Sequence, residues 1–189
     1  MGSCRAEESI VHTAYEHLDL LPANISLAGA EFDLLDGDGA EAHLANALKS
    51  VRGYYDYIII DCPPSLGMLT INAMVASDGV IIPMQCEFYA LEGLSQLTVT
   101  IGRIKKRYNP RLAITGILIT MFNSRLSLST QVLAELKRHY GDRLFETAIS
   151  RNVRISEAPS FGMPVYYHDK RAKGAKDYLA LAKELVARA

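Results

Sequence analysis

The chain of 189 residues has no tryptophan, and only 8% of it is aromatic. Its three cysteines, Cys4, Cys62 and Cys86, are an odd number without Cys-x-x-Cys spacing. A disulfide framework and a zinc site are therefore not expected, and a reducing cytoplasm is the natural compartment. Apolar runs such as Ile117–Phe122 are far shorter than the roughly 20 residues that span a membrane. The polar stretch from Glu7 stands where a signal peptide needs an apolar segment.

Several catalytic signatures are also missing. No Gly-x-x-x-x-Gly-Lys-Ser/Thr loop, the usual cradle for nucleotide phosphates, occurs in the chain. A His-Glu-x-x-His zinc motif and a Gly-x-Ser-x-Gly nucleophile elbow are absent as well. The glycine-rich stretch Asp36–Gly39 has no lysine and is predicted to be a turn. Cys62 and Cys86 lie in apolar surroundings that are typical of inert core thiols.

The net charge is close to zero, at −1, but it is unevenly distributed along the chain. Residues 1–100 carry 3 basic and 14 acidic side chains, a net charge of −11. Residues 101–189 carry 17 basic and 7 acidic side chains, a net charge of +10. This asymmetry indicates an anionic partner for the second half.

Continuous apolar segments alternate with amphipathic ones. Strands are predicted at Tyr57–Ile60, Val80–Ile82, Ile114–Phe122 and Leu144–Ile149. Helices are predicted at Glu41–Arg52, Gly67–Ser77, Leu91–Tyr108, Leu128–Tyr140 and Lys173–Arg188. This alternation favours one α/β domain over residues 1–189, with a mostly parallel sheet flanked by helices. Ligands of such sheets bind at the carboxyl ends of the strands.

Asp61 ends the first predicted strand, Tyr57–Ile60. Four apolar residues followed by aspartate have the form of a Walker B strand, whose carboxylate holds Mg²⁺ directly or through water beside nucleotide phosphates. The same pattern also occurs where an aspartate simply caps a turn or a helix. Pro63 and Pro64 restrict the backbone and stiffen the exit from the strand.

Basic residues follow the two later strands. Arg125 comes after Ile114–Phe122, and Arg151 and Arg154 come after Leu144–Ile149. Further basic residues precede and open the last helix: Lys170, Arg171, Lys173 and Lys176. On one face they form a phosphate-binding stripe with salt-dependent, sequence-independent affinity for nucleic acid. The alternative is an ordinary solvated surface.

Four segments, taken in order, resemble the ParA/Soj chromosome- and plasmid-partitioning ATPases of the chromosomal Soj type. These segments are Tyr55–Gly67, Pro83–Gly93, Thr120–Arg125 and Arg151–Gly162. The resemblance runs from about Glu8 to the C-terminus and implies a deviant-Walker P-loop NTPase fold with ATP and Mg²⁺ as ligands. It further implies an ATP-bound homodimer, non-specific binding to DNA and a ParB-type partner that stimulates hydrolysis.

The resemblance also assigns site residues. Asp61 matches the Walker B aspartate and is expected to hold Mg²⁺ through water. Ser150 and Asn152 match positions that contact adenine, although the family usually has proline where Ser150 stands. Arg125 and Arg154 match arginines that the family uses to bind DNA, in agreement with the basic second half.

One part of the family pattern has no counterpart here. The family begins with the P-loop strand, its signature lysine and a second strand with a water-activating aspartate. Phosphoryl transfer depends on positioning and charge stabilisation by such groups, so no catalytic residue is assigned and ATP hydrolysis is not expected. We therefore expect an N-terminally incomplete domain, a fragment or truncated gene product, whose apolar strand edges are left unpaired.

The predicted function is that of an ATP-dependent, non-specific DNA-binding switch in bacterial chromosome or plasmid segregation, in the cytoplasm on the nucleoid. One alternative is a non-enzymatic remnant that binds DNA or pairs with a full-length relative. Another is a membrane-cycling ATPase of the MinD type, which requires a basic amphipathic membrane helix at the C-terminus. Lys173–Arg188 instead has the pattern of an ordinary docked helix, so no membrane partner is expected.

Overall fold

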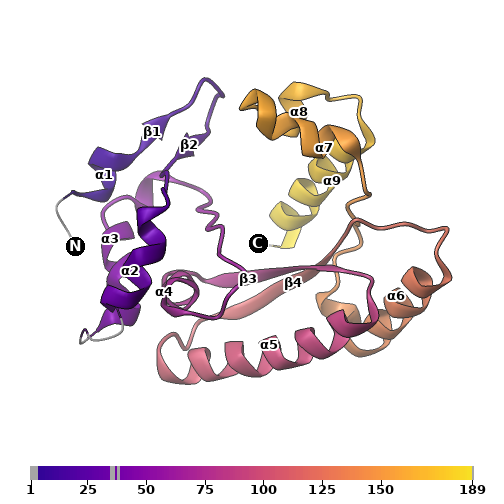
Figure 1. The fold of residues 1–189 in the computed structure, drawn as a ribbon, viewed down its shortest axis with the longest axis horizontal. Coiled ribbons are helices and arrows are strands. Elements are labelled where there is room, and N and C mark those ends of the chain that lie inside the picture. The colour runs from indigo at the N-terminus through magenta and orange to yellow at the C-terminus, as the bar shows by residue number, and fades with distance from the viewer. Residues whose placement is uncertain (1–3, 35–36, 38, 189) are drawn as a thin grey trace. The chain divides into compact units, whose positions relative to one another are not determined.

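The computed structural model describes residues 4–34, 37 and 39–188 and divides into two compact units (Figure 1). The first unit comprises residues 1–78 and 101–112, and the second comprises residues 79–100 and 113–189. Helix α5 (Phe88–Arg107) therefore belongs to the second unit up to Thr100 and to the first from Ile101. The turn predicted at Asp36–Gly39 includes positions that lie outside the described residues.

Short helices make up most of the first unit. Its elements are α1 (Ala6–Ser9), β1 (Val11–His12), β2 (Asp19–Leu20), α2 (Ser26–Leu34), η1 (Ala40–Ala42), α3 (His43–Leu48), η2 (Arg52–Tyr54) and α4 (Met68–Ala76). The strands β1 and β2 pair antiparallel. The continuous helix predicted at Glu41–Arg52 is wrong, because the chain breaks there into η1, α3 and η2. Ser50 and Gly53, both weak helix formers, lie where the regular helix has ended.

Two buried asparagines join the helices of the first unit. Asn72, which is 3% exposed, accepts a hydrogen bond from the Leu44 N–H at 3.1 Å and donates one to the Ala40 carbonyl at 2.8 Å. Asn109 donates to the Ser77 carbonyl at 2.7 Å. A buried polar group without a partner costs about 1–3 kcal/mol, so these contacts fix α4 against α3 and against the segment that follows α5.

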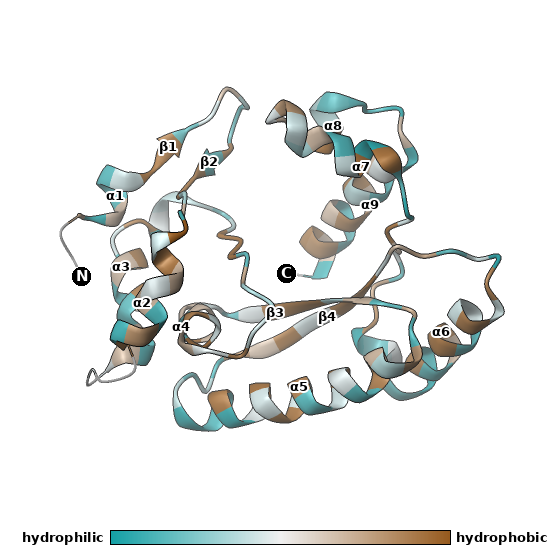
Figure 2. Cartoon of the chain, viewed as in Figure 1, coloured by the Kyte–Doolittle hydropathy of each residue, from teal (hydrophilic) through white to brown (hydrophobic). Residues whose placement is uncertain are grey.

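The second unit contains the parallel sheet. Its remaining elements are β3 (Gly79–Gln85), β4 (Ala113–Thr120), α6 (Ser127–Tyr140), η3 (Gly141–Arg143), α7 (Val153–Glu157), η4 (Ala158–Phe161), α8 (Val165–His168) and α9 (Lys173–Arg188). The strands β3 and β4 pair in parallel, with Ile82 opposite Ile117 and a bulge after Val80. Both strands are predominantly hydrophobic (Figure 2), as expected for strands that are covered on both faces. The predicted α/β fold with a parallel sheet and flanking helices is confirmed.

The segment predicted as a strand at Leu144–Ile149 forms isolated bridges and single hydrogen bonds with β4 and the residues that follow it, instead of a regular ladder. Parallel bridges join Leu144 to Ile117 and Ser150 to Phe122. The bridges are six residues apart in this segment, from Leu144 to Ser150, but five residues apart in its partner, from Ile117 to Phe122. This segment therefore bulges between them. The prediction of a regular strand is therefore wrong, although the predicted parallel neighbour is present.

A tightly packed cluster joins this segment to the sheet and to α9. Leu118, Phe145 and Ile149 are buried together, and Leu181 and Leu185 of α9 pack against them. A Cβ atom on Gly116 would lie 2.3 Å from the Phe145 ring. Only glycine at that position of β4 lets the ring approach so closely.

The three long helices agree with the sequence pattern. Predicted at Leu91–Tyr108, Leu128–Tyr140 and Lys173–Arg188, they are observed as α5, α6 and α9 with ends that differ by at most a few residues. Within the described ranges, none of the helices has both the length and the apolar character needed to cross a membrane.

The predicted strand Tyr57–Ile60 is not formed. The described chain runs through these residues without regular secondary structure, and the Ile59 side chain is 84% exposed. No ladder partner for the segment exists among the described residues, and a strand without a partner leaves its backbone groups and apolar side chains to solvent. Cys62, predicted to be a core thiol, is exposed for the same reason, whereas Cys86 is buried as predicted.

Candidate functional site

The ends of β4 and of the neighbouring segment meet at one edge of the second unit. The bridge between Phe122 and Ser150 places the two chain segments side by side where both leave the sheet. The Phe122 N–H donates to the Ile149 carbonyl at 3.0 Å, which fixes this register. The loop that carries Arg125 and the segment that runs from Ser150 to Arg154 therefore start from the same edge, where ligands of parallel sheets bind.

Ser150 is held by a carboxylate of α9. Its backbone N–H donates to Asp177 Oδ2 at 2.9 Å, and Lys173 pairs with the other carboxylate oxygen at 3.0 Å. Burial alone would raise the pKa of Asp177, but the hydrogen bonds from Ser150 and Lys173 outweigh it, and the pKa is lowered. Asp177 is thus ionised at neutral pH and fixes the backbone at Ser150.

Glu184, two turns further along α9, holds the backbone of the bulge as Asp177 holds that of Ser150. Its carboxylate accepts the backbone N–H groups of Glu146 at 2.8 Å and of Thr147 at 2.9 Å. These are N–H groups that a regular ladder would have satisfied. Burial opposes ionisation of Glu184, but the two N–H donors and Arg188 lower its pKa.

Asn152 caps α7. Its side-chain Oδ1 accepts the N–H of Arg154 at 3.0 Å, and the residue is half-buried. Close packing against α9 fixes this helix start, because a Cβ atom on Gly174 would lie 2.5 Å from the side chain of Ile155. The carbonyl oxygen of the amide is used by the cap, so the amide nitrogen is the group that Asn152 can offer to an acceptor on a ligand.

Arg154 is exposed, but its guanidinium lies beside two carboxylates. Its Nη1 lies 2.7 Å from Glu157 Oε2, and its Nε lies 3.6 Å from Asp169 Oδ2. The hydrogen bond between Arg154 and Glu157 raises the pKa of the guanidinium and lowers that of the carboxyl. The His168 ring lies 3.7 Å from the same Glu157 oxygen and stacks on Phe161.

Arg125 differs from Arg154. It is exposed in the turn after β4, where its backbone N–H donates to Asn123 Oδ1 at 3.1 Å. Among the residues that the structure describes, its guanidinium forms no ion pair. Arg125 therefore presents a full positive charge to solvent.

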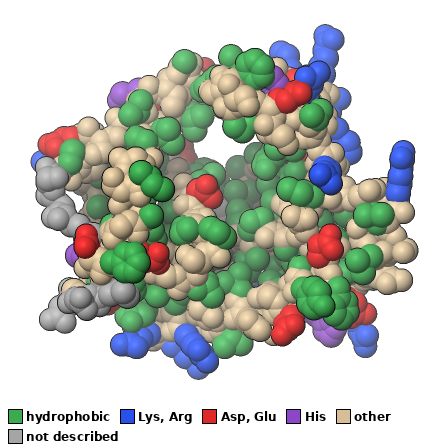
Figure 3. All heavy atoms as spheres, in the orientation of Figure 1, with side chains coloured by type: hydrophobic (Ala, Val, Ile, Leu, Met, Phe, Trp, Pro, Cys, Tyr) green, Lys and Arg blue, Asp and Glu red, His purple; other side chains and the backbone are tan. Residues whose placement is uncertain are grey.

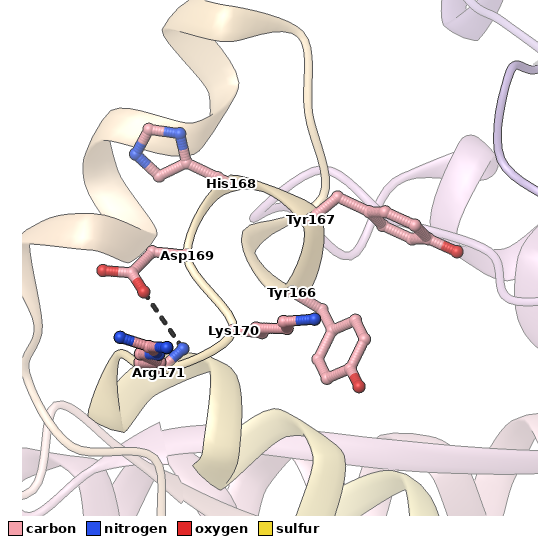
Figure 4. A pocket seen from close by; sticks show the side chains of 6 residues that line it. All are labelled: Tyr166, Tyr167, His168, Asp169, Lys170 and Arg171. Carbon is pink, nitrogen blue, oxygen red and sulfur yellow. Dashed lines mark hydrogen bonds between the residues drawn. The ribbon is translucent and has the colours of Figure 1, made fainter.

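A shallow hollow is lined in part by Asp169, one of the two carboxylates beside Arg154. Six consecutive residues line it: Tyr166, Tyr167, His168, Asp169, Lys170 and Arg171 (Figure 4). The Asp169 carboxylate accepts the backbone N–H of Arg171 at 3.0 Å and so shapes the turn. Lys170 and Arg171 belong to the predicted basic stripe, and both are exposed. Figure 3 shows Lys and Arg side chains gathered over the region of α7 and α8.

Asp61 belongs to the first unit, whereas the four other predicted site residues belong to the second. It is exposed and follows the irregular segment Tyr57–Ile60. Across the described part of the chain, no three His, Cys, Asp or Glu side chains cluster in a way that holds a metal. A single carboxylate still fits Mg²⁺, since this ion is commonly held by one or two carboxylates together with water and substrate phosphates.

Sequence reasoning missed Asp177, Glu184, Glu157 and Asp169. The first two are seven residues apart, a spacing that places them on one face of a helix, and this signal was available. The carboxylates around Arg154 give a weaker signal, because Asp169 comes from a different element.

Known proteins match this chain over most or all of its length. A family model described as an AAA domain matches residues 1–114. Soj, the sporulation initiation inhibitor protein of Bacillus subtilis, is 54% identical over 175 residues, which are 93% of this chain and 69% of Soj. The chain belongs to the ParA/Soj family of partitioning ATPases. The chromosome partitioning protein ParA of Caulobacter vibrioides is 46% identical and matches the whole of this chain and 71% of its own length.

Solved structures agree with the family fold. Cobyrinic acid a,c-diamide synthase of Mycobacterium smegmatis, solved with bound ADP and magnesium, is 41% identical with a TM-score of 0.73, over 80% of this chain and 62% of that one. Apo McdA of Cyanthece, at 21% identity and a TM-score of 0.82 over 96% of this chain and 73% of its own, shows the fold alone. The chain thus has an α/β P-loop NTPase fold and spans between 62% and 73% of the length of these ParA-like proteins.

Proposed function

We propose that the chain acts as a ParA/Soj-type partitioning protein, a switch that binds DNA without sequence preference under the control of ATP and Mg²⁺. The observation that carries the proposal is the meeting of Arg125 and the Ser150–Arg154 segment at one sheet edge. Adenine-contacting and phosphate-contacting groups would then share one short segment. Nucleotide binding at Ser150 and Asn152 can in this way affect Arg154 directly.

The nucleotide site is proposed in two parts. Ser150 and Asn152 receive the adenine, with the Asn152 amide nitrogen as donor to a ring nitrogen. Asp61 holds Mg²⁺ through water. ATP and Mg²⁺ are supported by the ADP and magnesium in the Mycobacterium smegmatis structure. That protein's name describes a synthase, whereas two chromosome partitioning proteins ParA match 97% and 100% of this chain at 49% and 46% identity.

The proposed partners follow from the family. They are DNA of any sequence, a ParB-type protein and a second copy of the chain, with the nucleoid in the cytoplasm as the site of action. No membrane partner is proposed, because α9 is docked through Glu184 and through Arg188, which donates to the Leu144 carbonyl at 2.7 Å. A MinD-like role needs that helix free for a membrane.

DNA binding to a mixed-sequence duplex, measured at two salt concentrations with and without Mg-ATP, tests the proposal. We expect affinity to fall steeply with salt and to rise with Mg-ATP. Arg125→Ala should weaken binding and lower the salt slope by about one. Arg111→Ala, which removes an exposed arginine of the first unit, is the matched control and should leave the slope unchanged.

The segment Tyr57–Ile60, which is largely exposed and has no strand beside it among the described residues, favours a second candidate, a non-enzymatic module that binds DNA or pairs with a full-length relative. This module would bind DNA equally well with and without Mg-ATP. Equal affinity in both conditions, together with no effect of Asp61→Ala, would decide for it. Loss of the Mg-ATP response in Asp61→Ala would decide for the ATP-controlled protein.

A further inference from the structure

We propose that Glu157 and Asp169 form a carboxylate mask over Arg154, so that the guanidinium contacts a DNA phosphate only after it leaves these side chains. The inference rests on the proposed function and specifies how its DNA-binding edge is regulated. Arg125 is a cation of that edge that has no carboxylate partner among the described residues, whereas Arg154 is available only conditionally.

The geometry of the mask uses two separate edges of the guanidinium. Glu157 Oε2 accepts a hydrogen bond from Nη1 at 2.7 Å, and Asp169 Oδ2 lies 3.6 Å from Nε. Two-point recognition of a phosphate uses either the Nε and Nη2 donors or the Nη1 and Nη2 donors, so each of these pairs has one donor beside a carboxylate. The two carboxylates and the one guanidinium together carry a net charge of −1, which opposes a phosphate at Arg154 until the arginine moves away from them. The Arg154 side chain is 49% exposed, so solvent leaves room for that movement.

The two carboxylates have other partners that hold them when Arg154 leaves. Asp169 Oδ1 accepts the N–H groups of Arg171 at 3.0 Å and Ala172 at 3.2 Å. Glu157 lies 3.7 Å from the His168 ring, which is itself stacked on Phe161. The mask is therefore a fixed feature of the α7–α8 region, and Arg154 is the moving part.

The strength of the mask suits a reversible switch. An exposed ion pair that has to be broken lowers affinity by a factor of about two to five. DNA that already contacts Arg125 can overcome a factor of this size, whereas a weakly held anion cannot. Because Arg154 lies two residues after Asn152, whose Oδ1 caps its N–H, a ligand at Asn152 can shift the balance.

Charge-neutral variants of the mask test the inference in the full chain. Glu157→Gln keeps the size of the side chain and removes its charge. We expect it to tighten binding of a mixed-sequence duplex by about two- to fivefold and to steepen the log–log salt slope by about one, since one more phosphate contact forms. Asp169→Asn keeps the oxygen that shapes the turn and should act in the same direction with a smaller effect.

Glu146→Gln is the matched control, because it removes one negative charge from an exposed residue of the same unit that does not contact Arg154. We expect less than a twofold change and an unaltered slope. In an Arg154→Ala background, Glu157→Gln should behave like this control. Circular dichroism and thermal melting of each variant establish that it is folded.

The outcomes are separable from those of the proposed function. Weaker binding by Glu157→Gln, no difference from Glu146→Gln, or the same gain in the Arg154→Ala background each overturns the mask. If the wild-type chain binds no DNA, the proposed function fails, and the Arg154 Nε–H NMR signal is followed during titration with inorganic tripolyphosphate. The mask then requires Glu157→Gln to respond at a lower concentration than wild type, and equal concentrations overturn it.

Discussion

The segments Tyr57–Asp61 and Leu144–Asn152 share one sequence plan and have different structures. Each is a predicted strand followed by residues predicted to contact nucleotide. In the second unit, the run lies beside β4, its Ile149 side chain is 3% exposed, and carboxylates of α9 hold its backbone. In the first unit, the run has no strand beside it among the described residues, and Ile59 is 84% exposed. A segment with strand-like sequence packs into the fold only where partners take its N–H groups.

Matched isoleucine substitutions should give the largest difference between the two segments. Ile149→Ala removes a fully packed side chain and should lower the free energy of unfolding by about 3 kcal/mol. Ile59→Ala removes an exposed side chain and should change it by less than about 0.5 kcal/mol. Urea unfolding monitored by circular dichroism measures both. Equal effects would show that Tyr57–Ile60 is packed in solution and that the contrast is wrong.

The sequence predicted the second unit better than the first, for reasons that individual residues make clear. The strands β3 and β4 and helices α5, α6 and α9 carry strong periodic patterns, and their buried partners are present in the same unit. The patterns at Tyr57–Ile60 are equally strong, but a local pattern contains no information about whether a pairing strand exists. Asp61 and Arg154 could be singled out from their positions after predicted strands, whereas Asp169 beside Arg154 depends on a tertiary turn.

The next effect concerns the carboxylate that replaces the missing ladder. Glu184→Ala leaves the N–H groups of Glu146 and Thr147 without their acceptor, and we expect a loss of about 2 kcal/mol in the free energy of unfolding. Hydrogen exchange at these two amides should accelerate as well. Glu146→Ala leaves its own backbone N–H in place and should show neither effect. Unchanged exchange in Glu184→Ala would mean that the carboxylate does not hold the bulge.

A pH dependence of stability should accompany these contacts. The pKa values of Glu184 and Asp177 are lowered in the folded chain, from ordinary values of 4.5 and 3.8. Their contribution to stability is thus complete above those ordinary values and is lost as the pH falls through the lowered ones. The urea midpoint should decline in this acid range, and the combined variant Glu184→Gln with Asp177→Asn should decline less steeply. If the urea midpoint of the combined variant declines as steeply as that of wild type, the decline belongs to other carboxyl groups.

The smallest effect separates Asp61, which ends one segment, from Asp177 of α9, which holds the end of the other. Asp177→Ala removes the acceptor of the Ser150 N–H and the partner of Lys173, and we expect a loss of about 1 kcal/mol. Asp61→Ala should leave the unfolding free energy within about 0.5 kcal/mol of wild type, because the exposed carboxylate holds no part of the fold together. In the presence of nucleotide, we expect Asp61 to matter more for stability than Asp177. With Mg-ATP present, Asp61→Ala should lose the thermal stabilisation that wild type gains, and a gain equal to that of wild type would remove Asp61 from the proposed magnesium site.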